Sequence, residues 1–153
     1  MAITEEQAVV IARSPADVFA HMTAVERWPE WLIASGIVRV TRDAPDRDLA
    51  LGAGIHIDQV LAGIRSSTVV ATVTAFEAPS RLGVAGKDAD GVSVELDATL
   101  TPEGLGTSLA WRVRISLPFR LRIFEGMAAP QVRRAAALDL EAFKRRLESV
   151  AGT

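Results

Sequence analysis

The sequence predicts an α+β fold in which a curved antiparallel sheet of seven strands surrounds one long C-terminal helix, with two short helices after the first strand. Three observations predict this fold. A helix-start signal directly follows the first β-rich segment, apolar residues alternate with period two from Gly36 to Leu117, and a helical spacing replaces that alternation in the last 36 residues. A curved sheet cannot cover its own concave face, whereas a long amphipathic helix laid across it can.

The first strand and the first short helix come from the N-terminal part of the chain. The segment ITEEQAVVIA (3–12) is rich in β-forming residues and predicts a strand. In SPADVFAHM, Ser14 is suited to cap a helix, Pro15 to occupy its first position, and Asp17 to act as the acid of a capping box. A short helix is therefore expected to begin at Pro15.

The second short helix is expected within WPEWLIASG (28–36). Trp28 precedes Pro29, which disfavours the α conformation at Trp28, so Pro29 is expected to open the helix. Trp31 follows Trp28 by three residues, which lets the two indoles point the same way. Gly36 is a natural end for the helix.

Six further strands are expected between Gly36 and Leu117: IVRVTR, GIHIDQVLAG, STVVATVTAF, RLGVAG, GVSVELDATL and SLAWRVRISL. The last two predict a half-buried hairpin around the turn PEGLG. A register with Asp97 opposite Arg112 and Glu95 opposite Arg114 joins opposite charges on the outer face. A slip of one residue would turn the apolar set outward. The inner pairs of this register are Ala98 with Trp111 and Leu96 with Val113.

The long C-terminal helix follows Pro118. Apolar residues recur there at steps of four and three and form one stripe. Pro130 is expected to kink or break the helix into a short piece and a long piece. The stripe expected to face the sheet consists of Val132, Ala136, Leu140, Phe143 and Leu147.

Composition limits the class of function. The 153 residues predict one domain spanning 1–153. The net charge of −2 argues against a nucleic-acid surface, and the absence of cysteine excludes disulfides and thiolate chemistry. The two histidines are not in a metal-ligand spacing, so neither a metal nor a cofactor is expected. The N-terminus lacks the pattern of a secretory signal, and no apolar run is long enough to span a membrane, so we expect a cytoplasmic protein.

Three segments together resemble a known family. SPADVFAHMTAVERWPEWL resembles the N-terminal signature of the polyketide cyclase/dehydrase and lipid-transport (SRPBCC) families of the START-like superfamily. VTAFEAPSRL resembles their turn between the fourth and fifth strands, and LDLEAFKRRLES resembles their closing helix. The resemblance implies a helix-grip fold with a deep cavity between sheet and long helix. It does not choose among apolar-ligand carriers, aromatic cyclases, hormone receptors and co-chaperone domains.

The resemblance implies that Trp28 and Trp31 lie at one end of this cavity, where they either line it or fill it as core. A second argument comes from volume. Small residues are frequent on the expected concave face and on the helix, which predicts a pocket of a few hundred Å3, the low end for small-ligand sites, bordered by Trp28 and Trp111. The candidate ligand-binding residues are Phe19, Trp28, Trp31, His56, Val69, Ala71, Val94, Leu96, Trp111, Val113, Phe124, Met127, Ala136 and Leu140.

His56 and Asp58 are the candidates for catalysis, whereas His21, four residues after Asp17, is interpreted as a surface contact. A tight turn at Ala62-Gly63 would set His56 opposite Val69. The side chains of His56 and Asp58 would then point into the cavity, where they could perform acid/base chemistry. A shift of one residue would instead place Ile55 and Ile57 inside and leave the pair facing solvent. The sequence leaves both registers open.

Residues 119–124 also leave two interpretations open. Arg120 and Arg122 alternate with apolar residues, so this segment either contacts anionic lipid at a cavity mouth or is a solvated helix with its apolar side packed.

The favoured function is the binding of a hydrophobic small molecule, namely a lipid, a polyketide or an aromatic compound, by a monomer or homodimer. A polyketide cyclase or dehydratase acting in the same cavity is the first alternative, so the sequence does not decide whether the chain is an enzyme. The second alternative is a protein-interaction domain of the co-chaperone type with a collapsed cavity. Neither nucleic acid nor integral membrane association is expected.

Overall fold

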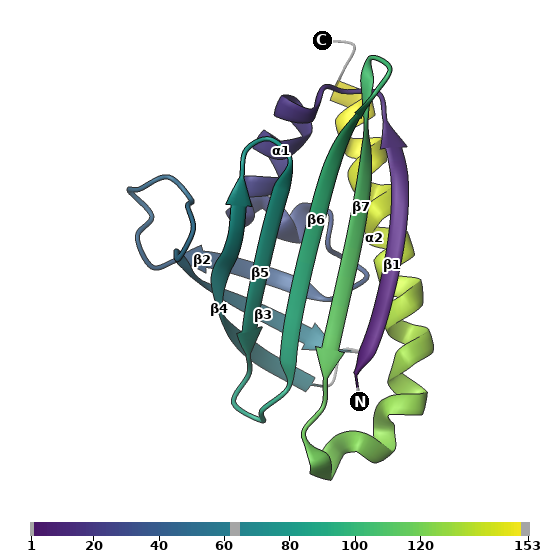
Figure 1. The fold of residues 1–153 in the computed structure, drawn as a ribbon. Coiled ribbons are helices and arrows are strands. Elements are labelled where there is room, and N and C mark those ends of the chain that lie inside the picture. The colour runs from purple at the N-terminus through teal and green to yellow at the C-terminus, as the bar shows by residue number, and fades with distance from the viewer. Residues whose placement is uncertain (1, 62–64, 151–153) are drawn as a thin grey trace.

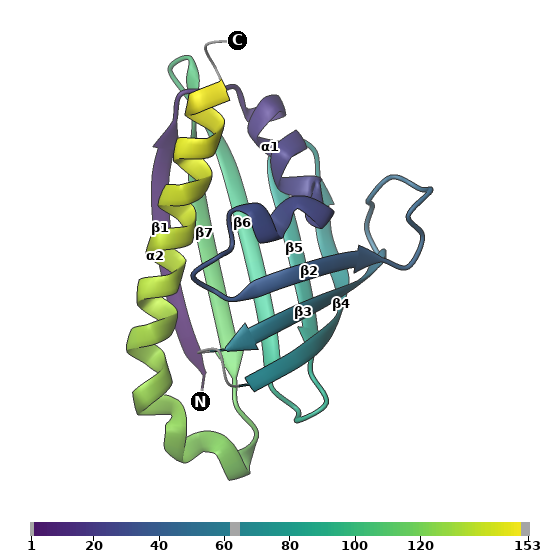
Figure 2. The same cartoon turned by 180° about the vertical axis from the view of Figure 1, so that it is seen from behind.

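The computed structural model describes residues 2–61 and 65–150, and its central feature is the curved antiparallel sheet. Neighbouring strands follow the order β1-β7-β6-β5-β4-β3-β2, and every pair is antiparallel. Figures 1 and 2 show the sheet curving around the long helix α2, as expected from the sequence. The strands are β1 Ile3–Ile11, β2 Ile37–Arg42, β3 Gly54–Leu61, β4 Arg65–Glu77, β5 Arg81–Lys87, β6 Ser93–Glu103 and β7 Gly106–Ser116.

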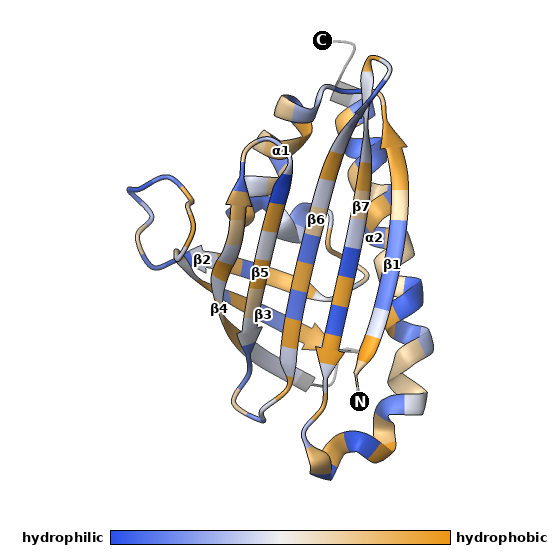
Figure 3. Ribbon diagram, viewed as in Figure 1, coloured by the Kyte–Doolittle hydropathy of each residue, from blue (hydrophilic) through white to orange (hydrophobic). Residues whose placement is uncertain are grey.

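The β6–β7 hairpin has the register that the charge pattern predicted. Asp97 lies opposite Arg112 and Glu95 opposite Arg114, while the inner positions pair Ala98 with Trp111. Figure 3 shows the alternation of hydrophilic and hydrophobic residues along both strands. Asp97 forms its ion pair with Arg81 on the neighbouring strand, at 3.1 Å. Burial of the apolar face therefore sets this register, and the outer charges are compatible with it.

The first short helix, α1 (Pro15–Thr23), begins as expected. The Ser14 hydroxyl accepts a hydrogen bond from the backbone N–H of Asp17 at 3.2 Å, which satisfies one donor of the first turn. The second short helix differs from the prediction. It is a 3₁₀ helix, η1 (Val25–Glu30), which begins before Trp28 and contains Pro29 instead of starting there. The 3₁₀ geometry accommodates a proline inside the turn that a regular α-helix would exclude.

The C-terminal helix α2 (Glu125–Val150) follows a second 3₁₀ helix, η2 (Phe119–Phe124). The expected break at Pro130 is wrong, because α2 continues through this residue. Pro130 lies in the second turn of α2, where its missing N–H removes a single intrahelical hydrogen bond. The short N-terminal piece that we assigned before Pro130 is η2 together with the first turn of α2.

The apolar stripe of α2 faces the sheet. Ala136, Leu140, Phe143 and Leu147 are buried, and Val132 is half-buried. Polar contacts fix α2 along β1 at three levels. The Arg133 guanidinium lies 3.1 Å from the Glu5 carboxylate, the Lys144 ammonium donates to the Val10 carbonyl, and the Glu148 carboxylate accepts from the Ala12 N–H.

Helix length and polarity bear on membrane insertion. Among the described residues, no helix has both the length and the apolar character needed to cross a membrane.

Candidate functional site

A cavity of about 810 Å3 lies between the concave face of the sheet and the first half of α2. Its wall combines residues from β1, β2, β3, β4, β6 and β7 with η1, the η1–β2 loop, the β5–β6 turn, η2 and α2. The apolar part of the wall includes Ile3, Trp28, Leu32, Ile37, Ile57, Val60, Val69, Val92, Val94, Leu96, Trp111, Val113, Ile115, Leu117, Leu121, Phe124 and Val132.

The cavity lies along the first half of α2 because that half carries small side chains. Ala128, Ala135 and Ala136 form part of the wall and do not reach across to the sheet. The second half carries Leu140, Phe143 and Leu147, which are buried in the hydrophobic core. α2 therefore packs against the sheet with its C-terminal half and leaves space beside its N-terminal half.

The small residues of the strands have a different explanation from the one that the sequence suggested. A Cβ on Gly86 would lie 2.4 Å from the Val70 carbonyl oxygen, and one on Gly54 would lie 2.1 Å from the Asp43 carboxylate. Close packing against the backbone of β4 requires Gly86, whereas at Gly54 the close atoms belong to the exposed side chain of Asp43, which can move aside. Ala71 and Ala98 are buried in the core and are not part of the cavity wall.

The two neighbouring tryptophans have separate roles. Trp28 is part of the cavity wall, and its buried indole N–H donates to the Met22 carbonyl at 2.8 Å. Trp31 is core: its ring centre lies 4.3 Å from that of Phe143 and 5.9 Å from that of Trp111. Trp111 completes the wall beside Trp28. The aromatic cluster thus separates the packed core from the open cavity.

The structure places eight of the candidate ligand-binding residues on the cavity wall and six elsewhere. Those on the wall are Trp28, Val69, Val94, Leu96, Trp111, Val113, Phe124 and Ala136. The six others are Phe19, Trp31, His56, Ala71, Met127 and Leu140. Phe19, Trp31, Ala71 and Leu140 are buried in the core, where Phe19 packs edge-on against Phe76 at 5.3 Å. Met127 points to solvent. Ligand binding by the eight wall residues stays a prediction.

His56 and Asp58 do not face the cavity, which corrects the catalytic candidate. His56 lies opposite Val70, and its ring is 3.4 Å from the Asp43 carboxylate on the exposed surface. Asp58 accepts a hydrogen bond from the Thr68 hydroxyl at 2.8 Å. The register is the alternative shifted by one residue, because burying Ile55 and Ile57 is more favourable than burying two ionisable groups. The predicted turn at Ala62-Gly63 lies outside the described residues.

A polar network that the sequence did not reveal lies at the cavity wall. The buried carboxylate of Asp139 accepts hydrogen bonds from the N–H groups of Ala34 and Ser35, at 2.8 and 3.0 Å, and from the Ser35 hydroxyl at 2.5 Å. The Gln59 side-chain amide donates to the Ser35 carbonyl at 2.9 Å. Ala34, Ser35 and Gln59 line the cavity, so Asp139 fixes this part of the wall to α2.

Asp139 gives a prediction about stability and pH. Burial raises the pKa of Asp139, although its three donors act in the opposite direction. Asp139→Ala should lower the free energy of unfolding by about 1–3 kcal/mol, because buried donors lose their acceptor. The folded chain holds the proton more tightly than the unfolded chain, so the contribution of Asp139 falls as pH rises from 3.8 through the raised pKa. Urea denaturation over this range should show the difference between wild type and variant shrinking with pH.

The matched control for this experiment is Asp46→Ala, which removes an exposed carboxylate from the loop between β2 and β3. Its effect on the free energy of unfolding should be within about 0.5 kcal/mol at every pH. A difference between wild type and Asp139→Ala that grows with pH would show that the three donors dominate and hold the pKa of Asp139 below its usual value.

One end of the cavity is bordered by η2 and the β5–β6 turn. The Arg120 guanidinium donates to the Asp90 carbonyl at 2.7 Å, and the same group lies 3.9 Å from the Asp90 carboxylate. The Asp88 carboxylate accepts from the N–H groups of Asp90 and Val92, which shapes the turn. Arg120, Asp88 and Asp90 are part of the wall, so this end of the cavity is polar.

Part of the wall could have been found from the sequence. Val92, Ile115 and Leu117 continue the same alternation as the candidates on β6 and β7, so they follow from the predicted register. Gln59 likewise follows Ile55 and Ile57 at a step of two, so the register that turns these isoleucines inward also places Gln59 on the inner face. Ser35 had no such signal. Ser35 precedes β2 in a loop, and the pairing of β2 with β3 is irregular between Ile37 and Arg39.

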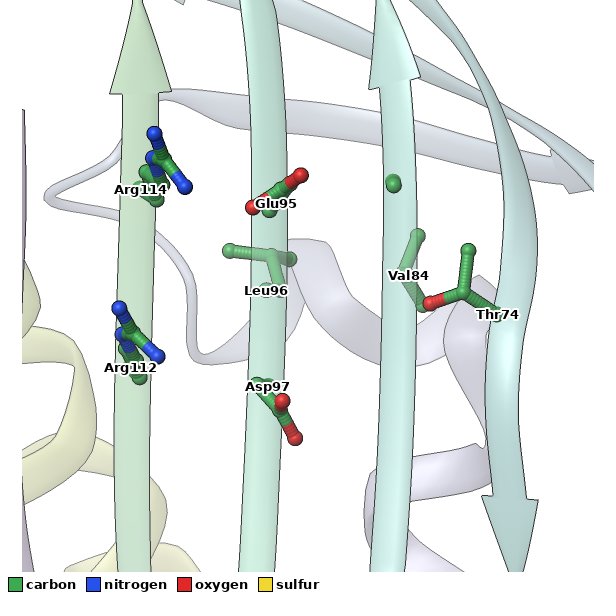
Figure 4. Close-up of a pocket in the computed structure, with 8 residues that line it drawn as sticks. Thr74, Val84, Glu95, Leu96, Asp97, Arg112 and Arg114 are labelled. Carbon is green, nitrogen blue, oxygen red and sulfur yellow. The ribbon is translucent and has the colours of Figure 1, made fainter. Parts of the chain in front are cut away.

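A second hollow, of about 250 Å3, lies on the outer face of the sheet and is lined by Thr74, Val84, Ala85, Glu95, Leu96, Asp97, Arg112 and Arg114. Figure 4 shows charged side chains of β6 and β7 standing side by side there. Asp97 pairs with Arg81, and Arg112 lies 3.6 Å from Glu6. Asp97 and Arg112 are thus paired on the surface, and the hollow is less than a third of the volume of the interior cavity, so the interior cavity is the better candidate site. Within residues 2–61 and 65–150, no group of three or more His, Cys, Asp or Glu side chains is placed to hold a metal ion.

Comparison with known proteins supports the same fold. The family model described as polyketide cyclase/dehydrase and lipid transport matches residues 2–148. No curated protein matches the chain. The solved structures include the protein TTHA0849 from Thermus thermophilus, with 14% identity, a TM-score of 0.75, and coverage of 98% of this chain and 99% of that one.

Two further solved structures carry functional names. The di-domain aromatase/cyclase StfQ of the steffimycin biosynthetic pathway is 13% identical, with a TM-score of 0.71, and the match covers 100% of this chain and 53% of that one. Truncated norcoclaurine synthase from Thalictrum flavum is 11% identical, with a TM-score of 0.66, and the match covers 96% of this chain and 94% of that one. At such low identity these matches establish the fold alone.

Proposed function

This chain belongs to the polyketide cyclase/dehydrase and lipid transport family, and from that premise we propose that it binds an apolar small molecule in the cavity between the sheet and α2. The ligand is a lipid, a polyketide or an aromatic compound. In this proposal the chain acts in the cytoplasm as a monomer or homodimer and needs no cofactor.

The observation that carries the proposal is the cavity itself. Its volume of about 810 Å3 is within the range of small-ligand sites, about 300–1,000 Å3. Natural cores rarely leave apolar space of this size unfilled, because each missing contact lowers stability. The mostly apolar wall suits a ligand that is recognised by shape, with polar groups near Gln59 and Arg120 to orient it.

The cyclase alternative has less support. Its proposed acid/base pair, His56 and Asp58, lies on the outer surface. Among the described wall residues, the only carboxylates are Asp88 and Asp90, both in the β5–β6 turn. The interaction-domain alternative required a collapsed cavity, and the open volume argues against it.

A titration with N-phenyl-1-naphthylamine, an uncharged aromatic probe, tests the proposal. The probe should bind saturably with one molecule per chain, gain emission, and quench tryptophan emission, because Trp28 and Trp111 line the cavity. Trp111→Ala should weaken binding of the probe. Trp111→Phe keeps an aromatic ring, so it should weaken binding less, and it serves as the test variant if Trp111→Ala is poorly folded. If the probe shows no saturable binding, the proposal fails.

A further inference from the structure

The surface of η2 and the first turn of α2 is unusually apolar. Phe119 and Ile123 are 84% and 82% exposed, and Met127 and Phe124 are 70% and 49% exposed. We call these four residues the η2 patch. The interpretation of this segment as a helix with a packed apolar side is wrong, because η2 extends beyond the end of the sheet (Figure 2), where no described element covers it. Exposed apolar side chains grouped in this way mark an interaction site.

The segment that carries the η2 patch is positively charged. Residues 118–134 contain four arginines (120, 122, 133 and 134) and one acid, Glu125, in a chain whose net charge is −2. Arg133 is paired with Glu5 and Arg120 with Asp90, so Arg122 is the arginine that lies against the patch. The Arg122 guanidinium lies 5.9 Å from the centre of the Phe119 ring, so positive charge lies next to the apolar surface. The partner should therefore be apolar and negatively charged.

We propose that the η2 patch docks on the surface of a bilayer that contains anionic phospholipid. The apolar side chains would enter the boundary between headgroups and acyl chains, while Arg122 and its neighbours contact the phosphates. A second copy of this chain fits less well, because a symmetric contact through this face would bring the same positive charges together.

Docking would bring one end of the cavity close to the membrane. Phe124 belongs to both the η2 patch and the cavity wall, and Leu121 on the same 3₁₀ helix is also a wall residue. The docking surface and the cavity therefore adjoin. Docking does not require that the cavity be occupied, so vesicle binding and ligand binding are separately measurable.

Vesicle flotation tests the docking proposal. The wild-type chain should bind vesicles of phosphatidylcholine and phosphatidylglycerol, bind pure phosphatidylcholine much more weakly, and dissociate at high salt. The double variant Phe119→Ser with Ile123→Ser should bind at least tenfold more weakly, and Arg122→Gln several-fold more weakly. The matched control is Leu105→Ser, because Leu105 is 100% exposed in the β6–β7 turn at the opposite end of the sheet (Figure 1).

Three results would overturn the proposal: no binding to anionic vesicles, equal loss in the Leu105→Ser control, or a dimer that the double variant abolishes while vesicle binding is absent. The last result would identify a second copy as the occupant. Titration of the double variant with N-phenyl-1-naphthylamine shows whether the cavity still binds the probe. This measurement separates failure of docking from failure of the proposed function.

Discussion

Ala135→Trp should weaken the binding of N-phenyl-1-naphthylamine at least tenfold, which corresponds to about 1.4 kcal/mol of binding free energy. Ala135 lies on the cavity wall in the first half of α2, where small side chains leave the space open. An indole at this position would occupy volume that the ligand needs. The emission of the probe itself is the measurement, because the variant adds a tryptophan to the chain.

The control for this variant is the same substitution two residues further along the helix. Ala137 is exposed and is not part of the cavity wall, so Ala137→Trp should leave the affinity unchanged. Both variants carry the same helix-propensity change. If Ala137→Trp weakens binding as much as Ala135→Trp, the effect reflects the helix in general and the cavity is not the binding site.

Phe143→Ala should lower the free energy of unfolding by about 3–5 kcal/mol, the usual loss when a buried phenylalanine is truncated. Phe143 is almost completely buried in the half of α2 that packs against the sheet, and its ring contacts Trp31. Truncation would leave a second void in a molecule that already contains a large one. Urea denaturation followed by circular dichroism measures the change.

Leu138→Ala is the matched control for this experiment, because Leu138 is on the same helix but more than half exposed. Its effect should stay below about 1 kcal/mol. Similar losses for both variants would mean that the burial of Phe143 between α2 and the sheet is not what stabilises the fold.

The fold could be predicted from the sequence because each element carries its own periodic signal. Period-two alternation identified the strands, and the spacing of Leu140, Phe143 and Leu147 identified the face of α2 that meets the sheet. Proline was a weaker guide. Pro29 and Pro130 both lie inside helices, because 3₁₀ geometry at one and the loss of a single hydrogen bond at the other are tolerated.

The candidate site was only partly predictable, since a cavity depends on how far opposing side chains reach in three dimensions. Ala128, Ala135 and Ala136 of α2 do lie on the cavity wall, whereas Gly86 is small because the backbone of β4 approaches it closely. No signal in the sequence indicated that Asp139 would hydrogen-bond to a distant loop. Its partners, Ala34 and Ser35, are about a hundred residues away in a loop that has no periodic pattern.

His56 illustrates how a single residue of register decides a functional interpretation. The sequence allowed both registers, and their consequences were opposite: an acid/base pair in the cavity or two polar side chains that face solvent. The apolar side chains of Ile55 and Ile57 decide between them. Their burial moves His56 to the outer face, beside Asp43.

Native mass spectrometry tests the central claim, that the cavity holds one apolar molecule, most directly. After mixing with N-phenyl-1-naphthylamine, the wild-type chain of 16.4 kDa should retain one probe molecule, and the Ala135→Trp variant should retain almost none. A wild-type chain without bound probe, or equal retention by wild type and variant, would contradict the account.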